Sequence, residues 1–349
     1  MESTILKMLV IISLFFLFKP AIFYVGIGTL IATIYVVLFN IKFTKRLLPD
    51  IKIKKKNFSL KKIKILISSG LWNSITNLGN VLADELDLLI SNIAIDASTM
   101  GIVALAKVPS NVINTMISSV SILFQPQAIE YYAKDNTEGV KEETIKGMKI
   151  TGVFGNIPFC YIVVFGSAFC SLWMPTVELK MLSLLCIITF VNVFSGGLTS
   201  SLYNIFTITN HVKGNAILNI ISGALSTVLV LIELKFTNLG VYAIVGTSAL
   251  VGLIKGFIIV PIYSAKCLKI KSNSFFMTIF KYLFTSSIMV GMFYILRIIL
   301  NPNSWLKIFI SVILCGIVGL LVNCYVLLKK EDRKLLIDMI KRKIIRVKN

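Results

Sequence analysis

An otherwise apolar stretch, residues 66–94, contains a row of amide and carboxylate side chains. Successive members are three or four residues apart, so an α-helix places them on one face: Asn73, Asn77, Asn80, Asp84 and Asp87. An acidic side chain at membrane depth is costly to expose to lipid and normally faces a bundle interior or a wet cavity. The row therefore predicts a polar binding or ion-coupling surface inside a helix bundle.

A second row with similar spacing occupies residues 99–124: Lys107, Asn111, Asn114 and Ser118. The loop between the two stretches is short, so we expect their helices to be antiparallel neighbours. At about 1.5 Å per residue, Lys107 lies at a depth similar to that of the two aspartates. We therefore predict an ion pair between Lys107 and Asp84 or Asp87, beside a backbone loosened by Pro109.

Weaker polar rows occur in later apolar stretches: Asn192, Ser195 and Thr199, then Asn215, Asn219, Ser222 and Ser226. Lys255 adds a cation inside the stretch 239–263. One interpretation is that amides and hydroxyls only hold helices together by hydrogen bonds. The charges in the first two rows favour a binding site, because they add a desolvation cost that helix packing alone does not require.

The composition indicates which elements position these side chains. Of 349 residues, 56% are hydrophobic and 15% are charged, and the mean hydropathy is +0.86. Soluble domains are roughly 45–50% apolar and 25% charged, so a soluble enzyme, a disordered chain and a fibrous protein are disfavoured. We expect an all-α membrane protein, because a lipid-exposed backbone must satisfy its own hydrogen bonds. Ten apolar stretches predict about ten transmembrane helices in a polytopic bundle: residues 5–18, 21–41, 66–94, 99–124, 148–172, 181–206, 214–234, 239–263, 276–298 and 305–328.

Basic residues alternate between successive loops. The chain has 36 Lys and Arg against 16 Asp and Glu, and most of the basic residues lie in one set of loops that includes 41–65, 125–147, 264–275 and 329–349. Because basic loops face the cytoplasm, we expect both termini there, a multi-pass protein of the cell membrane, and contacts with anionic lipids. No basic domain lies outside this pattern, so we expect no nucleic-acid partner.

The same features divide the chain into five predicted parts. They are a helix pair (1–41), a basic cytoplasmic loop (42–65), a six-helix lobe (66–263), two peripheral helices (276–328) and a basic, amphipathic cytoplasmic tail (329–349).

No arrangement of residues for catalysis is found. The sequence has no P-loop, HExxH motif or Gly-rich dinucleotide loop, and its one histidine, His211, leaves no partner for a Ser or Cys nucleophile. The six cysteines form no CxxC pair, and most lie in or beside apolar stretches. We therefore expect neither enzymatic activity nor a metal or other cofactor.

Several segments, in this order, resemble the polysaccharide flippases of the multidrug/oligosaccharidyl-lipid/polysaccharide exporter superfamily. They are Ser69-Gly70-Leu71-Trp72-Asn73 through Asp87-Leu88-Leu89-Ile90, Phe124-Gln125-Pro126, Tyr131-Tyr132-Ala133-Lys134-Asp135, Leu172-Trp173 and Asn210-His211-Val212-Lys213-Gly214-Asn215. The resemblance covers about residues 20–300. It implies that the helix pair 1–41 corresponds to the end of a first lobe whose first four helices have no counterpart here.

The resemblance implies a substrate and partners. The substrate would be an undecaprenyl-pyrophosphate-linked oligosaccharide, as used for O-antigen, lipopolysaccharide or capsule, moved to the outer leaflet by alternating access. Lys107, Lys255 and the asparagine rows could bind its pyrophosphate and sugars, and polysaccharide polymerase or assembly proteins would be partners. Two alternatives remain open: a cation-coupled exporter of drugs or small solutes, and a non-transporting membrane scaffold of a polysaccharide assembly complex.

The loop charges predict the orientation of the chain. Reporter fusions after Asp135 and Lys269 should be active on the cytoplasmic side, and fusions after Asp96 and Asn303 on the outer side. The side of the membrane on which each fusion lies is measured with two reporter enzymes, one active only in the cytoplasm and one active only outside. A single fusion on the opposite side would contradict the topology.

Overall fold

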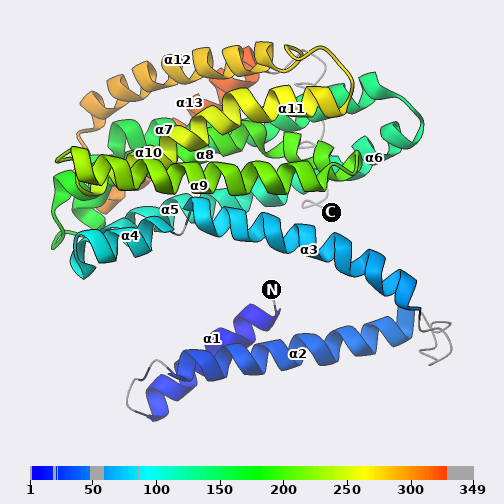
Figure 1. Cartoon of the computed structure of the whole chain (residues 1–349). Coiled ribbons are helices and arrows are strands. Elements are labelled where there is room, and N and C mark those ends of the chain that lie inside the picture. The colour runs from blue at the N-terminus through cyan, green and yellow to red at the C-terminus, as the bar shows by residue number, and fades with distance from the viewer. Residues whose placement is uncertain (1, 19–20, 22, 48–58, 85, 328–349) are drawn as a thin grey trace, which may run out of the picture. The chain divides into compact units, whose positions relative to one another are not determined.

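The computed structural model describes residues 2–18, 21, 23–47, 59–84 and 86–327. Within these ranges the chain is helical and has no strand, which confirms the all-α class (Figure 1). The chain forms two compact units, Met1–Ile67 and Ser68–Asn349.

The first unit is built around a hairpin of two helices, α1 (Glu2–Leu17) and α2 (Phe23–Leu47). Their close approach depends on Gly28, because a Cβ there would lie 2.7 Å from Cγ1 of Ile11. Phe15 and Tyr24 pack edge to face near the connection, with ring centroids 6.2 Å apart. Most other apolar side chains of both helices are exposed, as expected for helices that contact lipid.

The second unit contains the remaining helices and the part of α3 that follows Ile67. In chain order they are α3 (Leu60–Asp84), α4 (Leu86–Ala94), α5 (Ala97–Ser121), η2 (Ile122–Phe124), α6 (Gln125–Ala133), α7 (Thr137–Trp173), α8 (Leu179–Ile208), α9 (Val212–Phe236), α10 (Val241–Ile254), the π-helical η3 (Lys255–Ile259), α11 (Val260–Cys267), α12 (Phe276–Leu300) and α13 (Trp305–Val326).

Eight helical segments of the described chain are long and apolar enough to cross a membrane, and Ser3–Leu17 forms a shorter apolar helix. The predicted span 66–94 is not among them. It corresponds to α3 and α4, whose polar row lowers the hydropathy. The predicted loop 42–65 is shorter than expected, because α2 continues to Leu47 and α3 begins at Leu60. The predicted tail 329–349 lies outside the described residues.

The centre of the second unit is the crossing of α7 and α8. Gly155 and Gly197 face each other there, and a Cβ on Gly197 would lie 2.6 Å from Cα of Gly155. Tyr282 of α12 is fully buried against this crossing and donates a hydrogen bond to the carbonyl of Phe194 at 2.9 Å. Two helices that approach this closely leave no space between them, so any cavity must form elsewhere in the unit.

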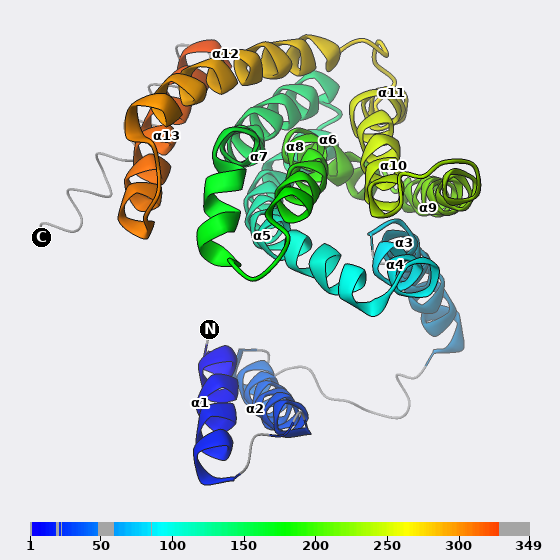
Figure 2. The ribbon, with the colours of Figure 1, turned by 90° about the vertical axis from the view of Figure 1, so that its left-hand side faces the viewer.

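The last two helices, α12 and α13, lie along one side of the unit (Figure 2). They were predicted to be peripheral helices, and their contact with α7 is polar. The fully buried Asn156 accepts a hydrogen bond from Ser286 at 2.8 Å and donates one to Asn323 at 3.3 Å. Asn323 also donates to the carbonyl of Gly319 at 2.7 Å. Hydrogen bonds between helices stabilise packing where the hydrophobic effect cannot.

This polar junction makes Asn156 important for stability. Asn156→Leu should lower the melting temperature of the detergent-purified chain, because Oδ1 of Asn323 loses its donor and Ser286 keeps only the Tyr282 carbonyl. An unsatisfied buried group costs about 1–3 kcal/mol. Ser287→Ala is the matched control, because the exposed Ser287 hydroxyl bonds only its own helix at Leu283. Equal melting temperatures for the two variants would contradict the assignment.

Candidate functional site

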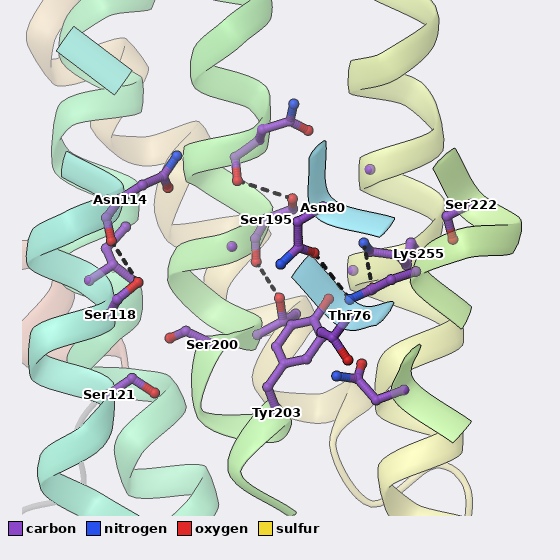
Figure 3. A pocket seen from close by; sticks show the side chains of 18 of the residues that line it. Thr76, Asn80, Asn114, Ser118, Ser121, Ser195, Ser200, Tyr203, Ser222 and Lys255 are labelled. Carbon is purple, nitrogen blue, oxygen red and sulfur yellow. Dashed lines mark hydrogen bonds between the residues drawn. The ribbon is translucent and has the colours of Figure 1, made fainter. Parts of the chain in front are cut away.

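A cavity of about 530 Å³ lies between α3, α5, α8, α9 and the α10–η3 segment. Most of the residues that line it carry amides or hydroxyls: Thr76, Asn80, Asn114, Ser118, Ser121, Asn192, Ser195, Thr199, Ser200, Tyr203, Asn204, Asn215, Asn219, Ser222, Ser226 and Ser248. Figure 3 shows side chains from several helices converging on this space. The unit therefore contains a hollow, polar region beside the closely packed α7–α8 crossing.

Lys255 is the cation of this cavity, and α9 helps to hold it. Its Nζ donates to Oδ1 of Asn219 at 3.2 Å, and Nδ2 of Asn219 donates to Oδ1 of Asn80 on α3 at 3.1 Å. Lys255 begins the π-helical segment η3. Such widened turns often occur at functional sites. The chain of contacts joins three helical segments at one level of the cavity.

A second cavity of about 470 Å³ adjoins the first, because Asn114, Ser118 and Asn192 line both. It contains the predicted ion pair, with Nζ of Lys107 3.2 Å from Oδ2 of Asp87 and side-chain exposures of 14% and 7%. The other carboxylate oxygen of Asp87 accepts a hydrogen bond from Ser248 at 2.6 Å. The predicted pairing is thus confirmed for Asp87.

The ion pair also joins four helices. Asp87 belongs to α4, Lys107 to α5 and Ser248 to α10, and the Ser248 hydroxyl lies 3.1 Å from that of Ser226 on α9. Ser226 lies two turns beyond Asn219 on α9, so the two charged levels are roughly 10 Å apart along the helix. The cavities therefore hold two basic groups at different depths.

Pro109, which was predicted to loosen the backbone beside Lys107, lies inside the continuous helix α5. Proline removes one backbone donor from a helix, and two carbonyls near Pro109 accept hydrogen bonds from side-chain hydroxyls. The hydroxyl of Thr189 donates to the carbonyl of Ala106 at 3.1 Å, and that of Ser110 donates to the carbonyl of Lys107 at 2.9 Å.

Most of the predicted site residues that are described meet in these cavities. Asn80, Asn114 and Lys255 line the first, and Asp87, Lys107, Asn111 and Asn114 line the second. Asn77 is exposed and lines neither cavity. Its neighbour Thr76 lines the first cavity instead. The side chains of Asn73 and Asp84 lie outside the described part of the structure.

Sequence reasoning missed the polar end of α8. Ser200, Tyr203 and Asn204 line the first cavity, and Nδ2 of Asn204 donates to the carbonyl of Ser121 on α5 at 3.0 Å. Their spacing continues the row of Asn192, Ser195 and Thr199. An extension of that row by one turn would have found them.

The cavities offer hydrogen bonds and positive charge. Oδ1 of Asn215, which lines the first cavity, is buried and has no hydrogen-bond partner. Such an acceptor is suited to a hydroxyl donor of a ligand. In the described part of the chain, no group of three or more His, Cys, Asp or Glu side chains could hold a metal ion. The arrangement suits non-covalent binding of a hydroxyl-rich solute that carries an anionic group.

The chain is similar to EpsK, an uncharacterized membrane protein of Bacillus subtilis (strain 168), with 25% identity over 277 residues. The match covers 78% of this chain and 54% of EpsK, so the chain spans about half the length of this relative. No family model matches the chain, and no solved structure matches it. Together with the eight apolar helices, the relative shows that the chain is a multi-pass membrane protein.

The buried ion pair leads to a stability prediction. Lys107→Met should sharply reduce the amount of folded protein in membranes, because breaking a buried pair costs about 3–5 kcal/mol. Asp87→Asn combined with Lys107→Met should recover most of the loss, because neither charge then remains buried. Size-exclusion chromatography of a fluorescent fusion measures the folded fraction.

The matched control removes an exposed ion pair. Lys134 lies 2.6 Å from Glu130, and both side chains are more than half exposed, so Lys134→Met should leave the folded fraction unchanged. If Lys107→Met had as little effect as Lys134→Met, the Asp87–Lys107 pair would not stabilise the bundle.

Proposed function

We propose that this chain is a transporter that moves an undecaprenyl-pyrophosphate-linked oligosaccharide from the cytoplasmic to the outer leaflet of the cell membrane. The observation that carries the proposal is the membrane-depth cavity lined by amides, hydroxyls and the Lys255 ammonium group. The transfer makes and breaks no covalent bond, so the proposal includes no enzymatic step and no cofactor. The sequence resemblance to polysaccharide flippases supports the same assignment.

The lining of the first cavity matches the chemistry of a glycan headgroup. Asparagine side chains both donate and accept hydrogen bonds, as sugar hydroxyls do. Asn114 of α5 and Asn192 and Asn204 of α8 line the cavity, and the unpartnered Oδ1 of Asn215 on α9 adds an acceptor. Such a surface would bind sugars in place of water, while the lipid tail stays in the bilayer.

The basic groups match the anionic part of the substrate. A pyrophosphate is bound by ammonium groups through charge-assisted hydrogen bonds. Lys255 lies at the level of Asn219, and Lys107 lies beyond it beside Asp87. We assign the pyrophosphate to Lys255, because its ammonium group lines the amide-rich first cavity, whereas Lys107 lines the second cavity beside the carboxylate of Asp87.

A drug exporter fits these observations less well. Among the described lining residues of the two cavities, Tyr203 is the one aromatic side chain, whereas pockets for drug-like molecules are mostly apolar and aromatic. Asp87, the carboxylate in the second cavity, is engaged by Lys107 and Ser248. The proposed partners are anionic lipids and the polymerase or assembly proteins that would receive the glycan.

Transport by proteoliposomes tests the proposal. The purified chain should transfer a fluorescently labelled undecaprenyl-pyrophosphate oligosaccharide between leaflets, measured by protection of the glycan from an enzyme confined outside the vesicles. Lys255→Gln should slow the transfer at least about tenfold, which corresponds to losing about 1.4 kcal/mol of the interaction with the pyrophosphate.

The control substitution is Lys281→Gln, which makes the same change at an exposed position on α12. Its transfer rate should equal that of the unmodified chain. Two results would overturn the proposal: no transfer by the unmodified chain, or transfer by Lys255→Gln at the unmodified rate.

A further inference from the structure

The amide of Asn219 links the cavity cation to a neighbouring helix. Asn219 is only 3% exposed. Its Oδ1 accepts from Nζ of Lys255 at 3.2 Å, and its Nδ2 donates to Oδ1 of Asn80 on α3 at 3.1 Å. The amide oxygen therefore accepts a hydrogen bond from one neighbour, while the amide nitrogen of the same side chain donates one to another. Any displacement of Lys255 therefore changes the surroundings of the Asn219 amide, which also binds Asn80 of α3.

The contact between α3 and α9 is close at this point. A Cβ on Gly79 would lie 2.8 Å from Cβ of Asn219, so the two helices meet at a glycine. Near the start of α9, Nζ of Lys213 lies 5.2 Å from the centre of the Trp72 ring on α3. By contrast, Leu78 and Val81 of α3 are exposed. The hydrogen bond between Asn219 and Asn80 is one of the contacts that hold α3 against α9 at the cavity.

The backbone that carries Lys255 is also unusual. Lys255 begins the π-helical segment Lys255–Ile259, and Pro261 follows in the first turn of α11. A π-helical turn is wider than an α-helical turn, and a return to α-helical geometry shifts the register of the side chains at its edge. Lys255 is thus placed where a small backbone change can move its ammonium group relative to Asn219.

We propose that Asn219 is a positioning residue that couples anion binding at Lys255 to the position of α3. The inference rests on the proposed function, because the anion is the pyrophosphate of the lipid-linked substrate. A multiply charged anion attracts the ammonium group more strongly than an amide oxygen does. Lys255 turns toward the anion, the Asn219 amide reorients, its bond to Asn80 is lost, and α3 moves away from α9.

This coupling has a consequence for the lipid tail. Thr76 and Asn80 of α3 line the cavity, so a shift of α3 opens the cavity wall next to the bilayer. The headgroup can then occupy the cavity while its lipid remains outside. Opening would occur only when the anionic part of the substrate has reached Lys255.

Trp72 provides an internal reporter of α3. The chain has three tryptophans, so Trp173→Phe with Trp305→Phe leaves Trp72 as the single one. In this background, inorganic pyrophosphate should shift the emission of Trp72 to longer wavelength in a saturable way, because Trp72 moves away from Lys213 into a more polar environment. Equilibrium binding of radiolabelled pyrophosphate, measured in parallel, gives the saturation of each variant.

The variants separate binding from coupling. Lys255→Gln should abolish both pyrophosphate binding and the emission shift. Asn219→Ala and Asn80→Ala, compared at pyrophosphate saturation, should lose the shift. Asn80 is exposed on α3, so its variant provides the test even if Asn219→Ala fails to fold. Lys213→Gln should keep a pyrophosphate-dependent shift, which shows that the anion does not act by binding beside Trp72.

Two different failures are distinguishable. If pyrophosphate binds in a Lys255-dependent way but Trp72 emission does not change, or if Asn80→Ala retains the full shift, the coupling is overturned and the anion site stands. If the folded, unmodified chain does not bind pyrophosphate, the anion site of the proposed function is overturned together with the coupling.

Discussion

The arrangement of the second unit depends on one constraint: an ionised carboxylate inside an apolar helix bundle requires a cation and hydrogen-bond donors. Asp87 has both: the cation is Lys107 on the next helix, α5, and the donor is Ser248 on α10, 161 residues further along the chain. Because the cost of leaving either charge alone at membrane depth is several kcal/mol, the pair fixes α4, α5 and α10 relative to one another. The serine contact extends this restraint to α9. The polar interior therefore holds the bundle together as well as offering a surface for ligands.

Dense and hollow regions lie side by side in this bundle because glycine and asparagine are placed on opposite sides of α8. On one side, Gly155 and Gly197 allow α7 and α8 to touch. On the other side, Asn192 projects into both cavities, and Gly252 leaves it room, since a Cβ there would lie 2.3 Å from the Asn192 amide oxygen. A rigid crossing next to a polar cavity is the arrangement that a transporter requires, because only the loosely packed side can change shape without disturbing the core.

The two lysines of the cavities illustrate how surroundings assign a role to the same residue type. Lys107 lies against a carboxylate in a four-helix network, so its main contribution is to stability. Lys255 lies at a π-helical turn and donates to an amide that in turn holds α3. A lysine exchanges a hydrogen bond to a side-chain amide for an anionic ligand more easily than it exchanges an ion pair. The proposed anion site and the proposed coupling follow from this difference.

The sequence alone determined the helical class, the positions of the apolar stretches and the polar rows, because lipid solvation and helical periodicity act on local composition. It also predicted that Lys107 pairs with an aspartate, since helix geometry fixes relative depth across a short loop. The choice of Asp87, the link from Lys255 through Asn219 to Asn80, and the polar junction of Asn156 with Asn323 required the tertiary structure. The contacts of Asn219 and of Asn156 join residues 36 to 167 positions apart, and periodicity within one helix carries no information about which other helix its polar face meets. The same holds for the hydroxyl of Thr189 on α8, which only the folded bundle brings to the carbonyl of Ala106 near Pro109 on α5.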